Sequence, residues 1–432
     1  MMLLLLTVLA LAALTTTASA PLHSFVSIGD WGGAALEDYH ETDQLAVAKQ
    51  LTATAAAIKA QFVVNTGDNF YYYGVKSVND PQWQKTFENV FVGDSLMIPW
   101  YGVLGNHDYG FNPESQLHYK SPNNDRWQMP ARYYTKRIQI GSTGSFISLI
   151  ALDSSPCMQD YRGTDKSKWD PCGSDYPGPS DCRFHQHVLN QSCAEQYNWL
   201  QKVMPTIPKD DWRIVVNHAP ADELDVNDLT SVLQDAGFDL YLNGHTHVLK
   251  YYQIDGSGAY VTTGAGCMVE VSGKGSHKEK KRKEKKSRKG VARNGHTFEN
   301  IWNQKTAGFT SHTFSEDLSE LTTNFWDYKG NKLYSFVVRK GSGPKPGPSP
   351  GPGPSPGPSP GPSPASSCCH YSDSSCDAGA VCCKSGCDDP SSCSYTQYGC
   401  TGRYGQKHHC EWNGSTCVVG GGDLARVAPF DK

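Results

Sequence analysis

Short apolar runs and longer mixed stretches alternate along roughly the first 250 residues, and this pattern predicts an α/β body. The apolar runs are rich in β-branched and aromatic residues and end in glycine or a polar residue, which is typical of buried strands. They cover residues 24–29, 61–67, 99–105, 145–154, 212–218 and 238–245. The stretches between them predict helices over residues 42–60, 195–203 and 226–235, and a further helix that begins at Asn79-Asp80-Pro81.

The pattern changes after residue 250. Apolar runs at residues 259–266, 306–314 and 333–340 predict strands with no helix between them. Alternating strands and helices that are followed by a strand-rich part are typical of sheets covered by helices. We therefore expect an α/β sandwich.

The N-terminal segment is predicted to be a secretory signal peptide. Its apolar core, Leu3 to Leu14, is too short to span a bilayer and is followed by small residues. The segment has no Lys or Arg before this core, and Pro21 directly follows a cut at Ala20, so a cut after Ala18 stays open as an alternative. We assign residues 1–20 to the signal peptide and expect an exported protein with no membrane span.

Residues 341–367 form a Pro-, Gly- and Ser-rich segment with a near-repeat. Such a composition cannot bury a core and favours extended polyproline conformations, so it predicts an exposed, semi-rigid linker. The linker separates a body, residues 21–340, from a tail, residues 368–432. The tail has too few apolar residues for an ordinary core.

The 15 cysteines favour an oxidising compartment, and they fall into two groups. Ten lie between Cys368 and Cys417, where five disulfides would replace the missing core of the tail. In the body we expect a buried free thiol at Cys267 and two disulfides among four cysteines, namely Cys157, Cys172, Cys182 and Cys193.

The tail has two open interpretations. A linker followed by a small disulfide-rich module with aromatic residues such as Tyr371 and Trp412 resembles the layout of secreted enzymes that carry polysaccharide-binding modules. The alternative is a protease-resistant cap without a ligand. This choice rests on likeness of architecture alone.

Charge adds little to the picture. The formal net charge of -4 implies no particular partner, and we expect no nucleic-acid binding. A basic run at residues 275–290 predicts a solvated loop, with capture of polyanions as the alternative. Asn190 and Asn413 lie in glycosylation sequons, and export makes both candidate glycan sites.

Metal-binding residue types follow five of the predicted strands. The residues at the ends of these strands or shortly after them are Asp30, Asp68 with Tyr71, Asn106 with His107, His218, and His245 with His247. Ligands of open α/β sheets bind beyond the carboxyl ends of the strands. Carboxylate, imidazole and amide donors suit Fe, Zn or Mn, and the lack of thiolates argues against zinc-finger and iron–sulfur sites.

Each of these pieces alone has an ordinary structural explanation. A Gly-Asp pair after a strand is more often a turn or a helix cap, and a single histidine is more often a hydrogen-bonded polar residue. All five together, in this order and all at strand ends, predict a two-metal site of the kind that promotes displacement at phosphorus.

Five short motifs carry a family resemblance. GDWG at residue 29, GDNFY at residue 67, GNHD at residue 105, VVNH at residue 215 and GHTH at residue 244 resemble the motif order of the metallophosphoesterases. Asp30-Trp31 in the first motif and Tyr71 in the second are similar to the purple acid phosphatases of the small, tartrate-resistant type. The resemblance spans about residues 23–340 and implies a catalytic domain with a four-layer α/β/β/α sandwich.

The resemblance also implies a role for each candidate residue. A ferric ion would be bound by Asp30, Tyr71 and His247, and a second, divalent ion (Fe, Zn or Mn) by Asn106, His218 and His245. Asp68 would bridge the two ions. His107 would stand outside the metal ligands and face the substrate, where an imidazole can protonate the leaving oxygen as a general acid or hold a phosphate oxygen.

The implied function is a secreted acid phosphatase, or one of the lysosomal or vacuolar lumen. It would hydrolyse phosphate monoesters of small molecules or phosphoproteins by attack of a metal-held hydroxide. The alternatives are a metallophosphodiesterase or nucleotidase on the same fold, and a non-catalytic secreted surface-binding protein. One departure stands out, because relatives often have a further histidine after the VVNH strand and here the loop reads APADELDVND. Whether Asp222 or Glu223 takes its place stays open.

Overall fold

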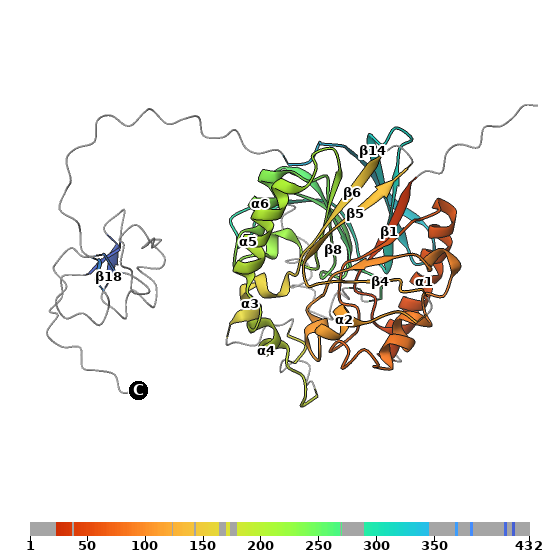
Figure 1. Cartoon of the computed structure of the whole chain (residues 1–432), viewed down its shortest axis with the longest axis horizontal. Coiled ribbons are helices and arrows are strands. Elements are labelled where there is room, and N and C mark those ends of the chain that lie inside the picture. Colours follow the sequence, from red (N-terminus) through yellow and green to blue (C-terminus); the bar gives the residue numbers. More distant parts are fainter. Residues whose placement is uncertain are drawn as a thin grey trace, which may run out of the picture. The chain divides into compact units, whose positions relative to one another are not determined.

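The computed structural model describes most of the body and a few strands of the tail (Figure 1). The described residues are 23–36, 39–122, 124–141, 144–163, 170–172, 179–267, 269 and 289–344, and four short strands after residue 367. The predicted signal peptide, nearly all of the linker, most of the basic run and the disulfides of the tail lie outside them. The chain divides into two units, Met1–Ser349 and Pro350–Lys432, and the predicted domain limits stay predictions.

Two mixed sheets form the centre of the first unit. The seven-stranded sheet has the order β15 (Lys332–Arg339), β14 (Glu320–Asp327), β13 (Gly308–Phe314), β1 (Ser24–Ile28), β2 (Val63–Asn65), β3 (Trp100–Gly102), β4 (Trp127–Gln128). The eight-stranded sheet has the order β11 (Lys289–Val291), β12 (Thr297–Gln304), β9 (Leu249–Ile254), β10 (Ser257–Thr263), β8 (Leu240–Asn243), β7 (Trp212–Val216), β6 (Ser145–Ala151), β5 (Tyr134–Ile140).

Side chains that alternate along the central strands bury both faces of each sheet. Phe25 of β1 and Ile214 of β7 belong to the apolar cluster between the sheets. Their sequence neighbours Val26 and Val215 belong to the cluster on the helix-covered faces. Because adjacent residues of a strand point to opposite faces, this division confirms the four-layer sandwich.

Helices cover the outer face of each sheet. Figure 1 shows the sheets between α1 (Tyr39–Ile58) on one side and α5 (Cys193–Val203) and α6 (Leu229–Ala236) on the other. The Ser192 hydroxyl caps α5 by accepting from the Glu195 N–H at 3.2 Å, and the Asp228 carboxylate caps α6 by accepting from the Ser231 N–H at 2.9 Å. Shorter helices are α2 (Glu114–His118), α3 (Gln159–Arg162) and α4 (Phe184–Leu189).

Some elements differ from the sequence prediction. The helix predicted after Pro81 is a π-helical segment, η2 (Trp83–Glu88), which buries both Trp83 and Phe87. Strands β4, β5, β9, β11, β12 and β14 were not predicted. Each of them mixes apolar and polar residues and contains no long apolar run, so the pairing partner rather than the local sequence determines the strand.

The cysteines of the body behave as predicted. Cys157 is bonded to Cys193 and Cys172 to Cys182, with Cα–Cα distances of 5.0 and 5.7 Å. Cys267 is a buried free thiol. In the second unit the described strands form a four-stranded sheet with the order β16 (Cys368–Cys369), β17 (Val381–Cys382), β19 (Cys417–Val419), β18 (Cys410–Trp412).

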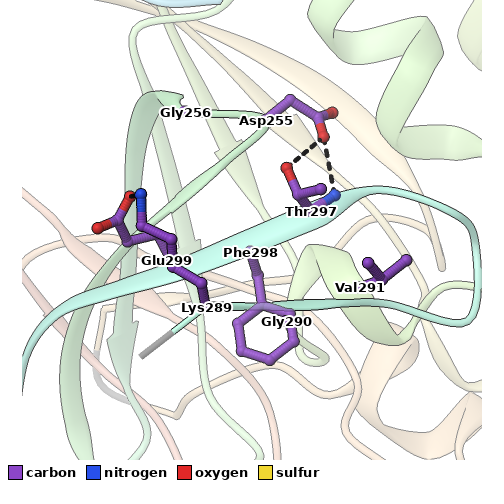
Figure 2. A pocket seen from close by; sticks show the side chains of 8 residues that line it. All are labelled: Asp255, Gly256, Lys289, Gly290, Val291, Thr297, Phe298 and Glu299. Atoms are coloured by element: carbon purple, nitrogen blue, oxygen red, sulfur yellow. Dashed lines mark hydrogen bonds and ion pairs between the residues drawn. The ribbon is translucent and has the colours of Figure 1, made fainter. Parts of the chain in front are cut away.

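His296 connects the hairpin made of β11 and β12 to the rest of the body. The His296 Nε2 atom lies 3.0 Å from Asp228 Oδ1 at the start of α6, and its Nδ1 atom contacts Asp255 in the β9–β10 turn. Asp255 also accepts from the Thr297 N–H at 2.8 Å, beside an open cavity of about 490 Å³ (Figure 2). Partial burial would lower the pKa of His296, but its two carboxylate partners raise it overall.

His296→Gln is expected to lower thermal stability more at pH 5 than at pH 8.5. Because the pKa of His296 is raised in the folded state, its contribution is fully present below the unfolded value of about 6.5 and is lost as the pH rises through the folded value. A partly exposed ion pair of this kind is worth about 1 kcal/mol, or roughly 2–4 °C in Tm. Calorimetry at both pH values measures the difference, with His118→Gln, at an exposed histidine of α2, as the control. An equal loss at both pH values would contradict the account.

Candidate metal centre

Strand register brings the five predicted strand ends together. In the first sheet, β1, β2 and β3 run parallel with Ile28 opposite Asn65 and Asn65 opposite Gly102. In the second sheet, β7 and β8 run parallel with Val216 opposite Leu242. The loops that follow these residues therefore begin at the same level, and the polar residues of both sheets converge at one edge of the sandwich.

Four donor atoms form a first group. Tyr71 Oη lies 3.2 Å from Asp30 Oδ1, 3.3 Å from Asp68 Oδ2 and 3.2 Å from His247 Nε2. The distance from His247 Nε2 to Asp30 Oδ1 is 3.4 Å. Two atoms that each lie about 2.1 Å from one cation are themselves about 3.0–3.4 Å apart, so this spacing fits a shared ion.

A second group adjoins the first. Asn106 Oδ1 lies 3.0 Å from His218 Nε2 and 3.1 Å from His245 Nδ1. His218 Nε2 is also 3.3 Å from Asp68 Oδ2, the same carboxylate oxygen that belongs to the first group. Asp30, Asp68 and His218 alone already bring their ligand atoms within 4.8 Å of one another. The geometry thus gives two adjacent donor groups with Asp68 between them.

The chemistry of the donors also fits cations. Asp30 and Asp68 are fully buried carboxylates, and the single proton of the Tyr71 hydroxyl cannot hydrogen-bond both at once. Burial and the two nearby carboxylates raise the pKa of Tyr71 well above its ordinary value, so the phenol ionises only if a cation offsets these charges. Bound metal ions would therefore compensate the buried charges of these residues, which hydrogen bonds among the residues themselves cannot do.

The histidines that surround Asp68 respond to its charge. Burial alone would lower the pKa of His218, but the Asp68 carboxylate raises it to about 10. Burial would raise the pKa of Asp68, yet His218 and His107 together hold it well below its ordinary value. These opposite shifts indicate strong attraction between the groups.

His107 lies beside the donor groups and not within them. Its backbone N–H donates to Asp68 Oδ1 at 2.9 Å, and its ring Nδ1 lies 2.8 Å from the Tyr72 carbonyl oxygen. The carbonyl can only accept, so Nδ1 carries the proton of the neutral ring and Nε2 is left for another partner. Burial lowers the pKa of His107 although Asp68 acts in the opposite direction.

The backbone at the site is strained. Asp30, Asp68, His245 and His247 have φ values of 55°, 52°, 73° and 51°, in the left-handed region that costs most residues energy. Glycines make the close approach of the loops feasible, because a Cβ at Gly105 would lie 2.2 Å from Asp68 Oδ1 and one at Gly244 would lie 2.3 Å from Asp30 Oδ2. Such strain is typical of functional sites.

Sequence reasoning missed Asp108, which connects the second and third motif loops. Its buried carboxylate accepts from the N–H groups of Gly105 at 2.8 Å, Asn69 at 3.1 Å and Phe70 at 3.2 Å. The only sequence signal was its place in GNHD, directly after His107. Asp108 thus holds the loops of Asp68 and Asn106 against each other without belonging to a donor group.

Sequence reasoning also left open the loop after β7. Glu223, at the end of η7 (Ala221–Glu223), places its Oε2 atom 3.3 Å from His245 Nε2. Asp222 has no such contact with the donor groups among the described residues. The cavity of Figure 2 is lined by β11, β12 and the β9–β10 turn, and none of its residues belongs to a donor group.

Comparisons with known proteins show the family of the chain. Residues 23–249, more than half of the chain, match the model of the calcineurin-like phosphoesterase family. The chain is 30% identical over 338 residues to tartrate-resistant acid phosphatase type 5 of Homo sapiens, covering 76% of this chain and 94% of that protein. It is 30% identical over 254 residues to purple acid phosphatase 7 of Arabidopsis thaliana, covering 56% of this chain and 70% of that protein.

A solved structure supports the fold alone. GAP50, the anchor in the inner membrane complex of Plasmodium, superposes with a TM-score of 0.52 at 22% identity and covers 74% of this chain and 90% of its own. Separately, among the described residues no helix is both long and apolar enough to cross a bilayer.

Proposed function

The chain is a purple acid phosphatase-like member of the calcineurin-like phosphoesterase family, and from this we propose that it hydrolyses phosphate monoesters in acid with two bound metal ions. Asp30, Tyr71 and His247 would hold a ferric ion, and Asn106, His218 and His245 a divalent ion (Fe, Zn or Mn). The observation that carries the proposal is that one carboxylate oxygen belongs to both donor groups. Asp68 Oδ2 lies 3.3 Å from Tyr71 Oη and 3.3 Å from His218 Nε2.

The donor types support the assignment of the two ions. Tyr71 would bind as a phenolate, a hard anionic oxygen that favours trivalent iron, whereas the amide and imidazoles of the other group suit a divalent ion. When bound, such a pair of ions neutralises phosphate charge and lowers the pKa of water. Asp30 and Asp68 are fully buried, so the two ions would be shielded from bulk water on the side that these carboxylates bind.

His107 would serve as the general acid. Its Nδ1–H donates to the Tyr72 carbonyl at 2.8 Å, which fixes the ring and leaves Nε2 to hold a proton for the leaving oxygen. The ring also packs edge-on against Tyr71, with centroids 4.6 Å apart. Acidic solution favours the protonated imidazole that this role requires.

The proposed setting is an exported one. The two disulfides of the body support an oxidising compartment, either outside the cell or in a lysosomal or vacuolar lumen. Small phosphomonoesters and phosphoproteins are the proposed substrates. Polysaccharide binding by the tail stays one of two open predictions.

Tyr71→Phe is expected to abolish visible absorption while Tyr72→Phe retains it. Charge transfer from a tyrosinate to iron requires the hydroxyl of the coordinating residue, and the Tyr71 hydroxyl lies in the first donor group. Tyr72 is a matched control because it is the next residue and its ring lies 5.8 Å from that of Tyr71. Absorption spectra with parallel iron analysis measure the effect. A visible band that persists in iron-loaded Tyr71→Phe would remove Tyr71 from the site.

Kinetics on two substrates across pH 4–8 test the proposed reaction. We expect a higher kcat/KM for p-nitrophenyl phosphate than for bis(p-nitrophenyl) phosphate, with the maximum on the acid side. Preference for the diester would support the phosphodiesterase alternative instead. No turnover of either ester by metal-loaded protein would favour the non-catalytic alternative.

A further inference from the structure

The loop after β7 carries a carboxylate that neither donor group uses. Glu223 Oε2 lies 3.3 Å from His245 Nε2, and the Glu223 side chain is 35% exposed whereas that of His245 is 4% exposed. The contact joins residues 22 positions apart in the sequence, from the loops that follow β7 and β8. Glu223 is therefore placed on the solvent side of a buried candidate ligand.

The two nitrogens of His245 face different surroundings. Nδ1 points into the second donor group, 3.1 Å from Asn106 Oδ1, and Nε2 points toward Glu223. His218 has the same arrangement with the nitrogens exchanged, since its Nε2 atom lies 3.0 Å from Asn106 Oδ1 and its Nδ1 atom 2.8 Å from the Thr66 carbonyl oxygen. Each imidazole thus offers one nitrogen to the donor group and the other to an oxygen acceptor outside it.

The loop that presents Glu223 is fixed from two sides. The Ala221 carbonyl accepts from Asn294 Nδ2 at 3.0 Å and from the Thr230 hydroxyl at 3.0 Å. The Ala221 N–H donates to the Tyr252 hydroxyl at 3.3 Å. These bonds anchor η7 to the β11–β12 hairpin, to α6 and to β9, so the position of Glu223 does not depend on its own contact with His245.

We propose that Glu223 is a positioning residue for His245. Its carboxylate accepts from the Nε2–H group, which holds the ring in the tautomer whose Nδ1 lone pair faces the second metal ion, and the negative charge makes that nitrogen a stronger donor. This inference rests on the proposed function, because it assumes that the second donor group binds a metal. Removal of such an outer partner typically weakens metal binding about 10- to 100-fold.

The proposal is tested by isothermal titration calorimetry, in which Zn²⁺ alone is added to the metal-free protein. In Glu223→Ala we expect the binding of Zn²⁺ to the second donor group to weaken about 10- to 100-fold and any other binding event to stay unchanged. Glu223→Gln keeps an acceptor without the charge and is expected to lose only a few-fold. Asp222→Asn removes a charge one position away, without a contact to His245, and is expected to bind as the wild type does.

The outcomes separate this inference from the proposed function. Wild-type protein that binds no Zn²⁺ ion would overturn both. Wild-type protein that binds Zn²⁺, together with Glu223→Ala of unchanged affinities, would overturn the role of Glu223 alone. If Glu223→Ala does not fold, Glu223→Gln decides, and affinities equal to those of the wild type would then contradict the proposal.

Discussion

Asp68→Asn is expected to lose both metal ions and to lower kcat/KM about 1,000-fold or more. The Oδ2 atom of Asp68 lies 3.3 Å from a donor atom in each of the two groups, so its negative charge would support two ions at once. Electrostatic stabilisation by bound metal is worth several kcal/mol, and each 1.4 kcal/mol is a factor of ten in rate. The effect should therefore exceed that of any other single ligand.

The choice of asparagine makes this test specific. Asparagine has the same shape, tolerates the φ of 52° at this position, and keeps an oxygen that can accept from the His107 N–H. Asp211→Asn is a suitable control, because Asp211 is also buried but lies just before β7, at the opposite end of this strand from His218, and pairs with Arg137. Metal content and kinetics are measured on both variants. Two ions and near-normal turnover in Asp68→Asn would disprove the shared-ligand role.

His107→Ala is expected to lower kcat about 100- to 10,000-fold and to leave both metal ions bound. The ring lies outside the donor groups, and the backbone N–H that donates to Asp68 is unchanged by the substitution. Only proton transfer to the leaving oxygen should suffer. The loss should consequently be larger for phenyl phosphate, whose leaving group needs a proton, than for p-nitrophenyl phosphate.

Two results would argue against a general acid at this position. Loss of metal from His107→Ala would place the ring among the ligands. An equal loss of kcat with both esters would mean that His107 binds the phosphate and does not protonate the leaving group.

The donor residues could be predicted because each lies in the loop that follows a strand. Once β1, β2 and β3 pair in register, Asp30, Asp68 and Asn106 must emerge at the same edge. The same holds for His218 and His245 after β7 and β8. Local sequence therefore contains most of the information about the donor groups.

The supporting residues could not be predicted in the same way. The contact of Glu223 with His245 depends on how η7 is anchored by Asn294, a residue 73 positions away from its partner Ala221. The bonds of Asp108 to Asn69 likewise cross 39 positions. Such contacts depend on loop conformation and not on strand periodicity, so no pattern in the sequence indicates them.

Metal analysis of the freshly purified wild-type protein tests the central claim most directly. Mass spectrometry of the metals, referred to protein concentration, is expected to give two ions per chain, of which at least one is iron. The second is expected to be iron, zinc or manganese. One ion per chain or fewer, or two ions without iron, would contradict the account.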